Sequence, residues 1–299
     1  MRVNRIILSA LLVALVVGLV QAQTATQPTP ASQVGAGPEG IATDGTSVFV
    51  ANQFSDTVSK LRASDGGVVG TFAVGHRPVA VAFDGAYFWV ANYLGNNVMK
   101  LDASGAVVAT YATGDGPGGL LATNGNLWVA NRNANTLTKL RAADGLTLGT
   151  YEVGERPISM TTDGKHIYVT NNDSDSVTKL SESNGVVAGV FPVGDGPFGI
   201  ACDGGSLWVA NFGSNNVMKL SLDGMLAGTY KVGDGPLSAV FSEGVVYVVN
   251  NGGDSVTKLS ALDGTSLGSI SVGRGPIGLL VSGKNVWVTN SGGNTVTKR

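Results

Sequence analysis

Short apolar runs and polar turns alternate along most of this chain in one repeating order. One copy reads "PFGIAC" up to Asp203-Gly204, then "SLWVAN", "NNVMKL" and "MLAGTYKV". Each run has about the length of one strand, and none shows the apolar period of about 3.6 that marks an amphipathic helix. Asp-Gly between the first two runs favours a two-residue hairpin, because that turn needs positive φ. The pattern predicts a four-stranded antiparallel meander and almost no helix in the mature chain.

The copies keep a strict spacing. Seven prolines follow one another at intervals of 39 or 40 residues, and an asparagine stands 14 residues after each of them. Four-stranded repeats of about 40 residues are typical of a β-propeller. Strands such as "LWVA" are apolar on both faces, as expected where each blade lies between two neighbours. We predict an all-β, seven-bladed propeller over residues 34–299, with repeats that begin near residues 34, 74, 113, 153, 193, 232 and 272.

The two ends of the chain are expected to close the ring together. The seventh copy stops at Arg299, after its third strand, whereas "QTATQPTPASQ" at residues 23–33 aligns with a fourth strand that runs into the first copy. Pro28 and Pro30 are two residues apart, so both missing N–H groups fall on one side of a strand, which only an edge strand tolerates. We therefore expect residues 23–33 to supply the outer strand of the last blade.

The first 22 residues have the composition of a secretory signal peptide. "MRVNR" is basic, "IILSALLVALVVGLV" is an unbroken apolar run, and small residues precede Gln23. The alternative is an uncleaved membrane anchor. The rest of the chain contains no stretch long and apolar enough to span a bilayer. We expect a monomer that is secreted or periplasmic and able to associate with the cell surface.

The net charge argues against a nucleic-acid partner, and the cysteine count excludes an internal disulfide. Without the two arginines of the leader, the formal charge of −2 becomes −4, and nucleic acid, which requires a basic face, is not an expected partner. Charged residues make up 13% of the chain, about half the usual share. Cys202 is the single cysteine, so no internal disulfide forms, and we interpret it as a small buried filler and not as a reactive thiol.

The phrase "IYVTN" at Ile167–Asn171 resembles the repeat that gives the YVTN family of β-propellers its name. The resemblance covers all seven copies, from Val34 to Arg299. It implies a secreted or surface-exposed propeller that serves as a binding or scaffold module, with no catalytic residue in the repeat itself. The chain departs from the family at one position of the repeat. The family usually has an apolar residue there, whereas this chain has a lysine in every copy, at Lys60, Lys100, Lys139, Lys179, Lys219, Lys258 and Lys298.

The streptogramin lyases are similar-looking propellers that use histidine chemistry. The chain has only His76 and His166, which lie on different predicted blades and in different turns. A lyase or hydrolase with its active site at the mouth of the central channel is therefore the alternative function. Such an enzyme would draw on the neighbourhood of His76, Asp115 and Glu155, since catalysis needs an acid or base within reach of substrate.

Residues repeated in every copy are best explained by the fold. The aromatic series, which uses all four tryptophans, lies in mid-strand among valines and predicts packing between blades, although a sugar-stacking ring is the alternative. For the lysine series we expect stems that cover apolar surface and ammonium groups that reach water or a carboxylate. The alternative is a basic belt for an anionic polymer, against which the net negative charge argues.

One turn resembles a calcium loop in part. In "NNDSDS", Asn171, Asp173 and Asp175 alternate, and Glu182 falls at the twelfth position of the loop. However, Ser176 replaces the glycine that the loop requires, and a predicted strand covers its second half. We interpret the segment as a structural turn and predict no metal and no cofactor.

Residues that differ between copies are the candidates for function. In a meander, the crossings before each proline and the hinges after each asparagine share one face, opposite the Asp-Gly turns. Some of these turns carry large side chains where small ones would be sufficient for the turn. Such side chains are suited to binding a ligand or partner. The alternative explanation is neutral drift in solvent-exposed turns. The candidate binding residues are Phe54, His76, Arg77, Tyr93, Leu94 and Arg132, and the candidates at the channel mouth are Asp115, Glu155, Arg156, Asp195, Asp234 and Arg274.

From these patterns we predict an exported, non-enzymatic binding or scaffold propeller. Its partner would be a protein or a glycan, bound on the face that carries the crossings and hinges.

Overall fold

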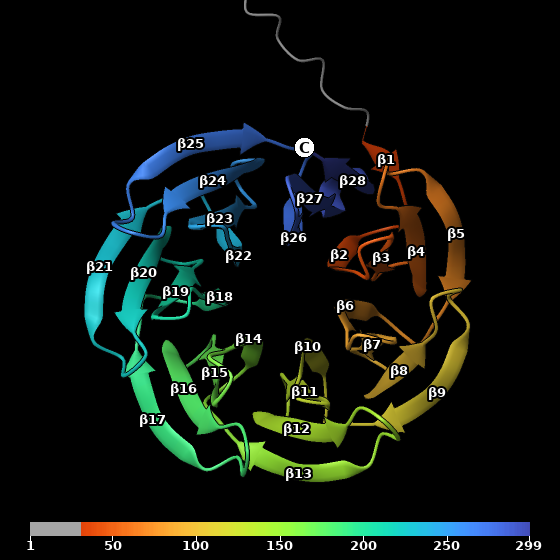
Figure 1. Ribbon diagram of the computed structural model, residues 1–299, viewed down its shortest axis with the longest axis horizontal. Coiled ribbons are helices and arrows are strands. Elements are labelled where there is room, and N and C mark those ends of the chain that lie inside the picture. The colour runs from red at the N-terminus through yellow and green to blue at the C-terminus, as the bar shows by residue number, and fades with distance from the viewer. Residues whose placement is uncertain (1–30) are drawn as a thin grey trace, which may run out of the picture.

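Each repeat folds into one four-stranded antiparallel sheet, and the seven sheets form a ring around a central channel (Figure 1). The structure is a computed structural model that describes residues 31–299. In each blade the first strand lies nearest the channel and the fourth lies at the rim. The predicted seven-bladed propeller is therefore confirmed.

The strand bounds repeat with the period of the sequence. The first blade contains β2 (Pro38–Thr43), β3 (Ser47–Asn52), β4 (Thr57–Arg62) and β5 (Val68–Ala73). Blades two and three contain β6 (Pro78–Phe83), β7 (Phe88–Asn92), β8 (Asn97–Leu101), β9 (Val107–Ala112), β10 (Pro117–Thr123), β11 (Asn126–Asn131), β12 (Thr136–Arg141) and β13 (Thr147–Glu152). Blades four and five contain β14 (Pro157–Thr162), β15 (His166–Asn171), β16 (Ser176–Ser181), β17 (Val187–Pro192), β18 (Pro197–Cys202), β19 (Ser206–Asn211), β20 (Asn216–Ser221) and β21 (Leu226–Lys231). Blade six contains β22 (Pro236–Ser242), β23 (Val245–Asn250), β24 (Ser255–Ser260) and β25 (Ser266–Ser271), and blade seven contains β26 (Pro276–Ser282), β27 (Asn285–Asn290), β28 (Thr295–Lys298) and β1 (Ser32–Gln33).

Strand β1 closes the ring, as the sequence predicts. Ser32 pairs with Val296 of β28 and Gln33 pairs with Thr295, so the N-terminal side of the chain supplies the outer strand of the last blade. Figure 1 shows β1 beside β28, near the C-terminus. The predicted signal peptide at residues 1–22 and most of the predicted closing segment lie outside the described residues.

Helix is almost absent from the described part of the chain. Between residues 31 and 299 it is limited to one 3-10 turn, η1 (Ser291–Gly293), in the hinge of blade seven. Within that range, no helix has both the length and the apolar character needed to cross a bilayer.

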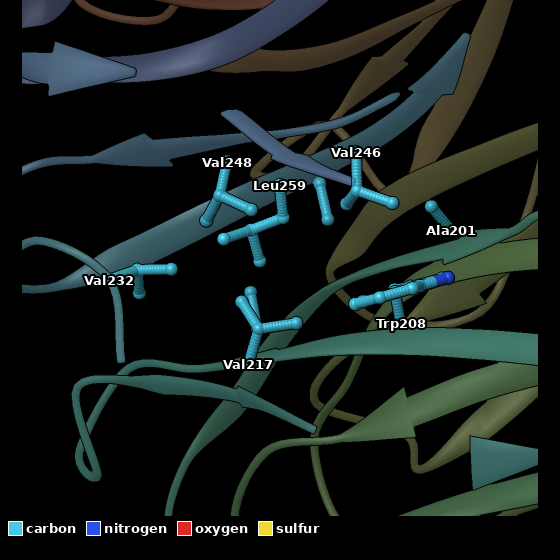
Figure 2. Packing of buried hydrophobic residues seen from close by; sticks show 9 residues of the cluster. Ala201, Trp208, Val217, Val232, Val246, Val248 and Leu259 are labelled. Carbon is cyan, nitrogen blue, oxygen red and sulfur yellow. The ribbon is translucent and has the colours of Figure 1, made fainter. Parts of the chain in front are cut away.

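The core consists of apolar clusters between adjacent blades. Figure 2 shows one of them, in which Trp208 of blade five faces Val246, Val248 and Leu259 of blade six. Trp208 is fully buried, and its indole N–H donates to Asp203 at 2.8 Å, so the ring's one polar atom is also satisfied. The aromatic series therefore packs between blades, with half-buried Tyr247 its most accessible member.

A hydrogen bond repeated at every blade junction joins each hinge to the next crossing loop. Four residues after each hinge asparagine stands an Asp or Asn with positive φ, and its side-chain oxygen accepts the N–H of the residue before the next proline, at 2.7–2.9 Å. Asp and Asn tolerate this backbone conformation better than most residues. The acceptors are Asp56, Asn96, Asn135, Asp175, Asn215, Asp254 and Asn294. Asp175 of the suspected calcium loop thus has a structural partner.

The lysine series connects neighbouring blades in a way that the sequence did not indicate. Six of the seven ammonium groups donate to backbone carbonyls in the turn between the third and fourth strands of the next blade, and six lie over the buried aromatic ring of their own blade. Of these, only Lys179 also donates to a carboxylate, at Asp223. The expected carboxylate partner is present for Lys179, and the Glu182 carboxylate lies 3.9 Å from Lys139, but the acceptors that six copies share are backbone carbonyls, which was not expected.

Lys258 is the exception within residues 31–299. The third and fourth strands of blade seven come from opposite ends of the described chain, so no hairpin offers Lys258 the carbonyl that its six counterparts use. This difference makes Lys258 a matched control for the series.

Replacing Lys139 by methionine is expected to lower the free energy of unfolding by about 1–3 kcal/mol, because the substitution leaves buried carbonyl groups without their charged donor. Lys139 is 5% exposed, donates to the Glu182 carbonyl at 2.6 Å and lies 4.9 Å from the centre of the Trp128 ring. Urea denaturation measures the change. Lys258→Met should stay within about 0.5 kcal/mol, as at an ordinary surface position. Equal effects at the two positions would contradict this role for the series.

Candidate functional site

Crossing loops and hinges share one face of the disc, which we call the crossing face. In each blade, backbone N–H groups of the hinge donate to carbonyls of the crossing loop, as Tyr93 does to Arg77 at 2.9 Å. The Asp-Gly turns lie at the opposite ends of the strands. His76 lies on the crossing face, whereas His166 lies beside an Asp-Gly turn, 3.0 Å from Asp163. The two histidines of the chain are therefore on opposite faces.

A channel of about 440 Å³ runs between the innermost strands of the blades. Apolar side chains such as Val79, Ile158 and Phe198 line most of it. Two charged side chains also line it, Glu39 of β2 and Arg132 of the hinge in blade three. Because Arg132 belongs to a hinge, this charged pair lies at the end of the channel that opens on the crossing face.

Three departures from the repeat meet at this mouth. The residue after each repeat proline is apolar in five blades, but it is Glu39 in blade one and Gly118 in blade three. Arg132 donates from Nη2 to the Gly118 carbonyl at 3.0 Å, and the same nitrogen lies 3.6 Å from the Glu39 carboxylate. A Cβ atom on Gly118 would lie 1.9 Å from Nε of Arg132. Only glycine at position 118 leaves room for the arginine to reach Glu39.

Burial acts against the charges of this pair. It raises the pKa of the Glu39 carboxyl, and the guanidinium groups of Arg132 and Arg77 offset this only in part. Burial also lowers the pKa of Arg132, against the attraction of Glu39. Nε of Arg132 is buried with no hydrogen-bond partner among residues 31–299. A buried ion pair is seldom more stabilising than apolar packing, and titratable groups perturbed in this way gather at functional sites.

Tyr93 lies next to both arginines of the mouth. The guanidinium carbons of Arg77 and Arg132 are 5.1 and 5.8 Å from the centre of its ring, and its hydroxyl donates to Asn133. Nε of Arg77 also donates to Gln53 at 3.4 Å. We call Glu39, Gln53, Arg77, Tyr93 and Arg132 the mouth cluster.

The structure brings three of the six predicted binding residues together, namely Arg77, Tyr93 and Arg132. His76 points away, with its side chain 76% exposed and its Nδ1 3.4 Å from Asp56. Phe54 and Leu94 are 68% and 61% exposed on the crossing face. These three side chains therefore lie outside the mouth cluster.

None of the six residues predicted at the channel mouth lines the channel. Arg156 lies 3.4 Å from Asp173, and Arg274 donates to the Gly292 carbonyl at 2.6 Å. Asp115 accepts from Asn133 at 3.4 Å. Glu155, Asp195 and Asp234 are exposed in their crossing loops. In every blade the second residue of the inner strand lines the channel, as Glu39 does, whereas these six residues stand in the crossing loops before that strand.

Glu39, Gln53 and Gly118 belong to this site but are not among the binding residues predicted from the sequence. The signal for Glu39 and Gly118 was present, because each breaks an otherwise apolar position in the repeat. That position follows the repeat proline, outside the crossings and hinges from which the candidates come. Cys202 lines the channel half-buried, and burial raises the pKa of its thiol, in agreement with a filler and not a nucleophile.

No family model and no curated protein matches the chain. Among solved structures it is similar to a streptogramin B lyase, with a TM-score of 0.79 and 18% identity over 90% of this chain and 96% of that one. A virginiamycin B lyase from Staphylococcus aureus has a TM-score of 0.78 and 16% identity, over 90% and 98% of the two chains. Hydrazine synthase from Kuenenia stuttgartiensis has a TM-score of 0.78 and 20% identity, over 94% and 99%. These likenesses show the propeller fold alone.

Proposed function

We propose that this protein is an exported, non-enzymatic binding or scaffold propeller of the YVTN-repeat type, which recognises a partner or glycan on its crossing face. The observation that carries the proposal is the convergence of Glu39, Gly118 and Arg132 from two blades at one end of the channel. A repeat that needed only to fold would be satisfied by apolar residues there. Arg77 and Tyr93 extend the same cluster onto the exposed face.

Binding accounts for this arrangement better than catalysis does. The two histidines lie on opposite faces, so they cannot act on one substrate. In the mouth cluster the arginines are held by Tyr93, Gln53 and the Gly118 carbonyl, which suits a preorganised recognition site. The N-terminal residues 1–22 fit a signal peptide, and this supports a secreted or periplasmic location in which the partner belongs to the cell envelope.

Replacing Phe54 and Tyr93 together by serine is expected to weaken binding to the native envelope fraction at least tenfold, or about 1.4 kcal/mol. Phe54 is an exposed apolar contact, and Tyr93 positions both arginines. Cosedimentation of the purified protein with the envelope fraction, at increasing protein concentration, measures the half-saturation point. The stability cost of Phe54→Ser should stay within about half a kcal/mol, as for a surface residue.

Phe212 supplies the matched control for Tyr93. It occupies the same hinge position in blade five, and its ring, like that of Tyr93, would lie 3.1 Å from a Cβ atom placed on the glycine of the next crossing loop. Within the described residues, no arginine lies over the Phe212 ring, in contrast to Tyr93. Phe212→Ser should leave envelope binding unchanged. Equal losses from the two sites, or no loss from either, would favour drift in exposed turns over a binding site.

A further inference from the structure

We propose that the ligand of the mouth cluster is an acidic saccharide, with carboxylate or sulfate groups on the free donors of Arg77 and Arg132 and a neighbouring hydroxyl group that donates to Glu39. This inference rests on the proposed function and assigns a ligand class to the same site.

Both arginines keep hydrogen-bond donors free for an anion. A guanidinium group carries five N–H donors. Arg77 uses only Nε, in a 3.4 Å bond to Gln53, and Arg132 directs Nη2 to Gly118 and Glu39. In the described part of the chain, both Nη atoms of Arg77 and Nη1 of Arg132 have no hydrogen-bond partner. Both guanidinium groups lie beside the Tyr93 ring, 5.1 and 5.8 Å from its centre, and guanidinium groups bind oxyanions through paired hydrogen bonds.

Glu39 adds a requirement that an anion alone does not meet. A carboxylate has about four lone-pair sites, yet its only side-chain partner within residues 31–299 is Arg132, at 3.6 Å. A neutral hydrogen-bond donor such as a hydroxyl would satisfy it. A neutral polysaccharide offers hydroxyl groups but no oxyanion, and an acidic peptide offers carboxylates but no ring of hydroxyl groups. A uronic or sulfated sugar carries both on one ring.

The equivalent arginine in blade four forms an ion pair with a neighbouring carboxylate, whereas no ion pair of Arg77 is found in the described part of the chain. Arg156 occupies the same repeat position, with φ of 53° against 55° for Arg77. Its guanidinium group lies 3.4 Å from Asp173 and 3.3 Å from Asn172, so a local carboxylate already neutralises it.

Beside the mouth cluster, Phe54 is 68% exposed and can stack on a sugar ring.

The test titrates the mature full-length protein with four polymers in an isothermal calorimeter. The probes are oligogalacturonate (carboxylated), dextran sulfate (sulfated), dextran (neutral) and polyglutamate (an acidic peptide). We expect at least one of the two acidic saccharides to bind at least tenfold more tightly than dextran and polyglutamate, and to weaken as salt rises. Tight binding of only one of them identifies the oxyanion as carboxylate or sulfate.

Arg77→Gly should reduce affinity for the acidic saccharide at least tenfold, whereas Arg156→Gly should leave it unchanged. Five of the seven blades already carry glycine at this position with positive φ, so both variants are compatible with the fold. Glu39→Gln should weaken saccharide binding, because it removes the acceptor for the sugar hydroxyl, but it should not weaken the binding of polyglutamate, which has no hydroxyl to donate. Equal binding of dextran, polyglutamate binding as tight as that of the sugars, or equal effects of the two glycine variants would overturn the inference.

The experiments separate two outcomes: that the ligand is not an acidic saccharide, and that the crossing face is not a binding face. If no saccharide binds but Arg77→Gly still weakens binding to the envelope fraction, the acidic saccharide is wrong and the proposed binding face stands. If Arg77→Gly and the Phe54 and Tyr93 double variant all leave envelope binding intact, the proposed function is wrong as well.

Discussion

Replacing Trp208 by alanine is expected to lower the free energy of unfolding by about 3–5 kcal/mol, the range for removing a large side chain from a core. Trp208 is fully buried between blades five and six, where it packs against Val246 and Val248 (Figure 2). The ring also lies 5.5 Å from that of Tyr230 and below the ammonium group of Lys219. The truncation would remove all these contacts and leave a cavity. Urea denaturation followed by tryptophan fluorescence and circular dichroism measures the loss.

Envelope binding by Trp208→Ala should fall only where the protein unfolds, because the side chain lies far from solvent. Phe212→Ala, four residues along the chain but 46% exposed, is the control and should change stability little. A Trp208→Ala protein that is as stable as the wild type but no longer binds would move the aromatic series from packing to recognition.

Deleting residues 23–33 is expected to cause aggregation or to remove several kcal/mol from a stability that is typically about 5–15 kcal/mol for a single domain. The deletion removes β1 and leaves β28 as an unpaired edge, which can recruit strands from other molecules. It also removes the hydroxyl of Ser32, which donates to the Gly66 carbonyl of blade one at 2.6 Å. The closing blade would then lose one of its links to the outer turn of blade one and keep that of Lys298.

Thermal unfolding together with size-exclusion chromatography measures this effect. A melting temperature unchanged by the deletion, with the protein still eluting as one species, would show that the ring does not depend on its closing strand. The junction would then be held by the bonds that remain, from Gly37 N–H to Asn294, from Lys298 to the Ala63 carbonyl and from Thr289 to the Glu39 carbonyl, and by the packing of Trp287.

Much of the fold could be predicted because a propeller is specified by local, repeated signals. Proline spacing, the Asp-Gly turns and the apolar runs each act within one blade of about 40 residues. Strand order within a blade follows from chain order. Successive turns of a meander lie on alternate faces, so the crossings and hinges share one face. Ring closure was readable for the same reason, since the seventh copy lacks one strand and the N-terminal segment has the pattern of that strand.

The contacts between blades were not readable in this way. The lysine series was visible as a repeat, but its acceptors are backbone carbonyls 42 to 44 residues later in the chain for five lysines and 235 residues earlier for Lys298. Backbone carbonyls are present at every residue, so no sequence pattern marks the ones that a neighbouring blade presents. The same holds for Tyr93 and Arg132, which lie in the hinges of adjacent blades and meet only because those blades pack together.

The sequence by itself therefore determined the number of blades, the strands in each, the closing strand and the face on which the repeat varies, because all of these depend on short-range periodicity. Only the tertiary structure decided that Glu39 of blade one and Arg132 of blade three meet at the channel mouth, with Gly118 making room for them. That meeting depends on the curvature of the closed ring, which brings residues 93 positions apart to within 3.6 Å. Curvature arises from packing between all seven blades at once, and no single repeat encodes it.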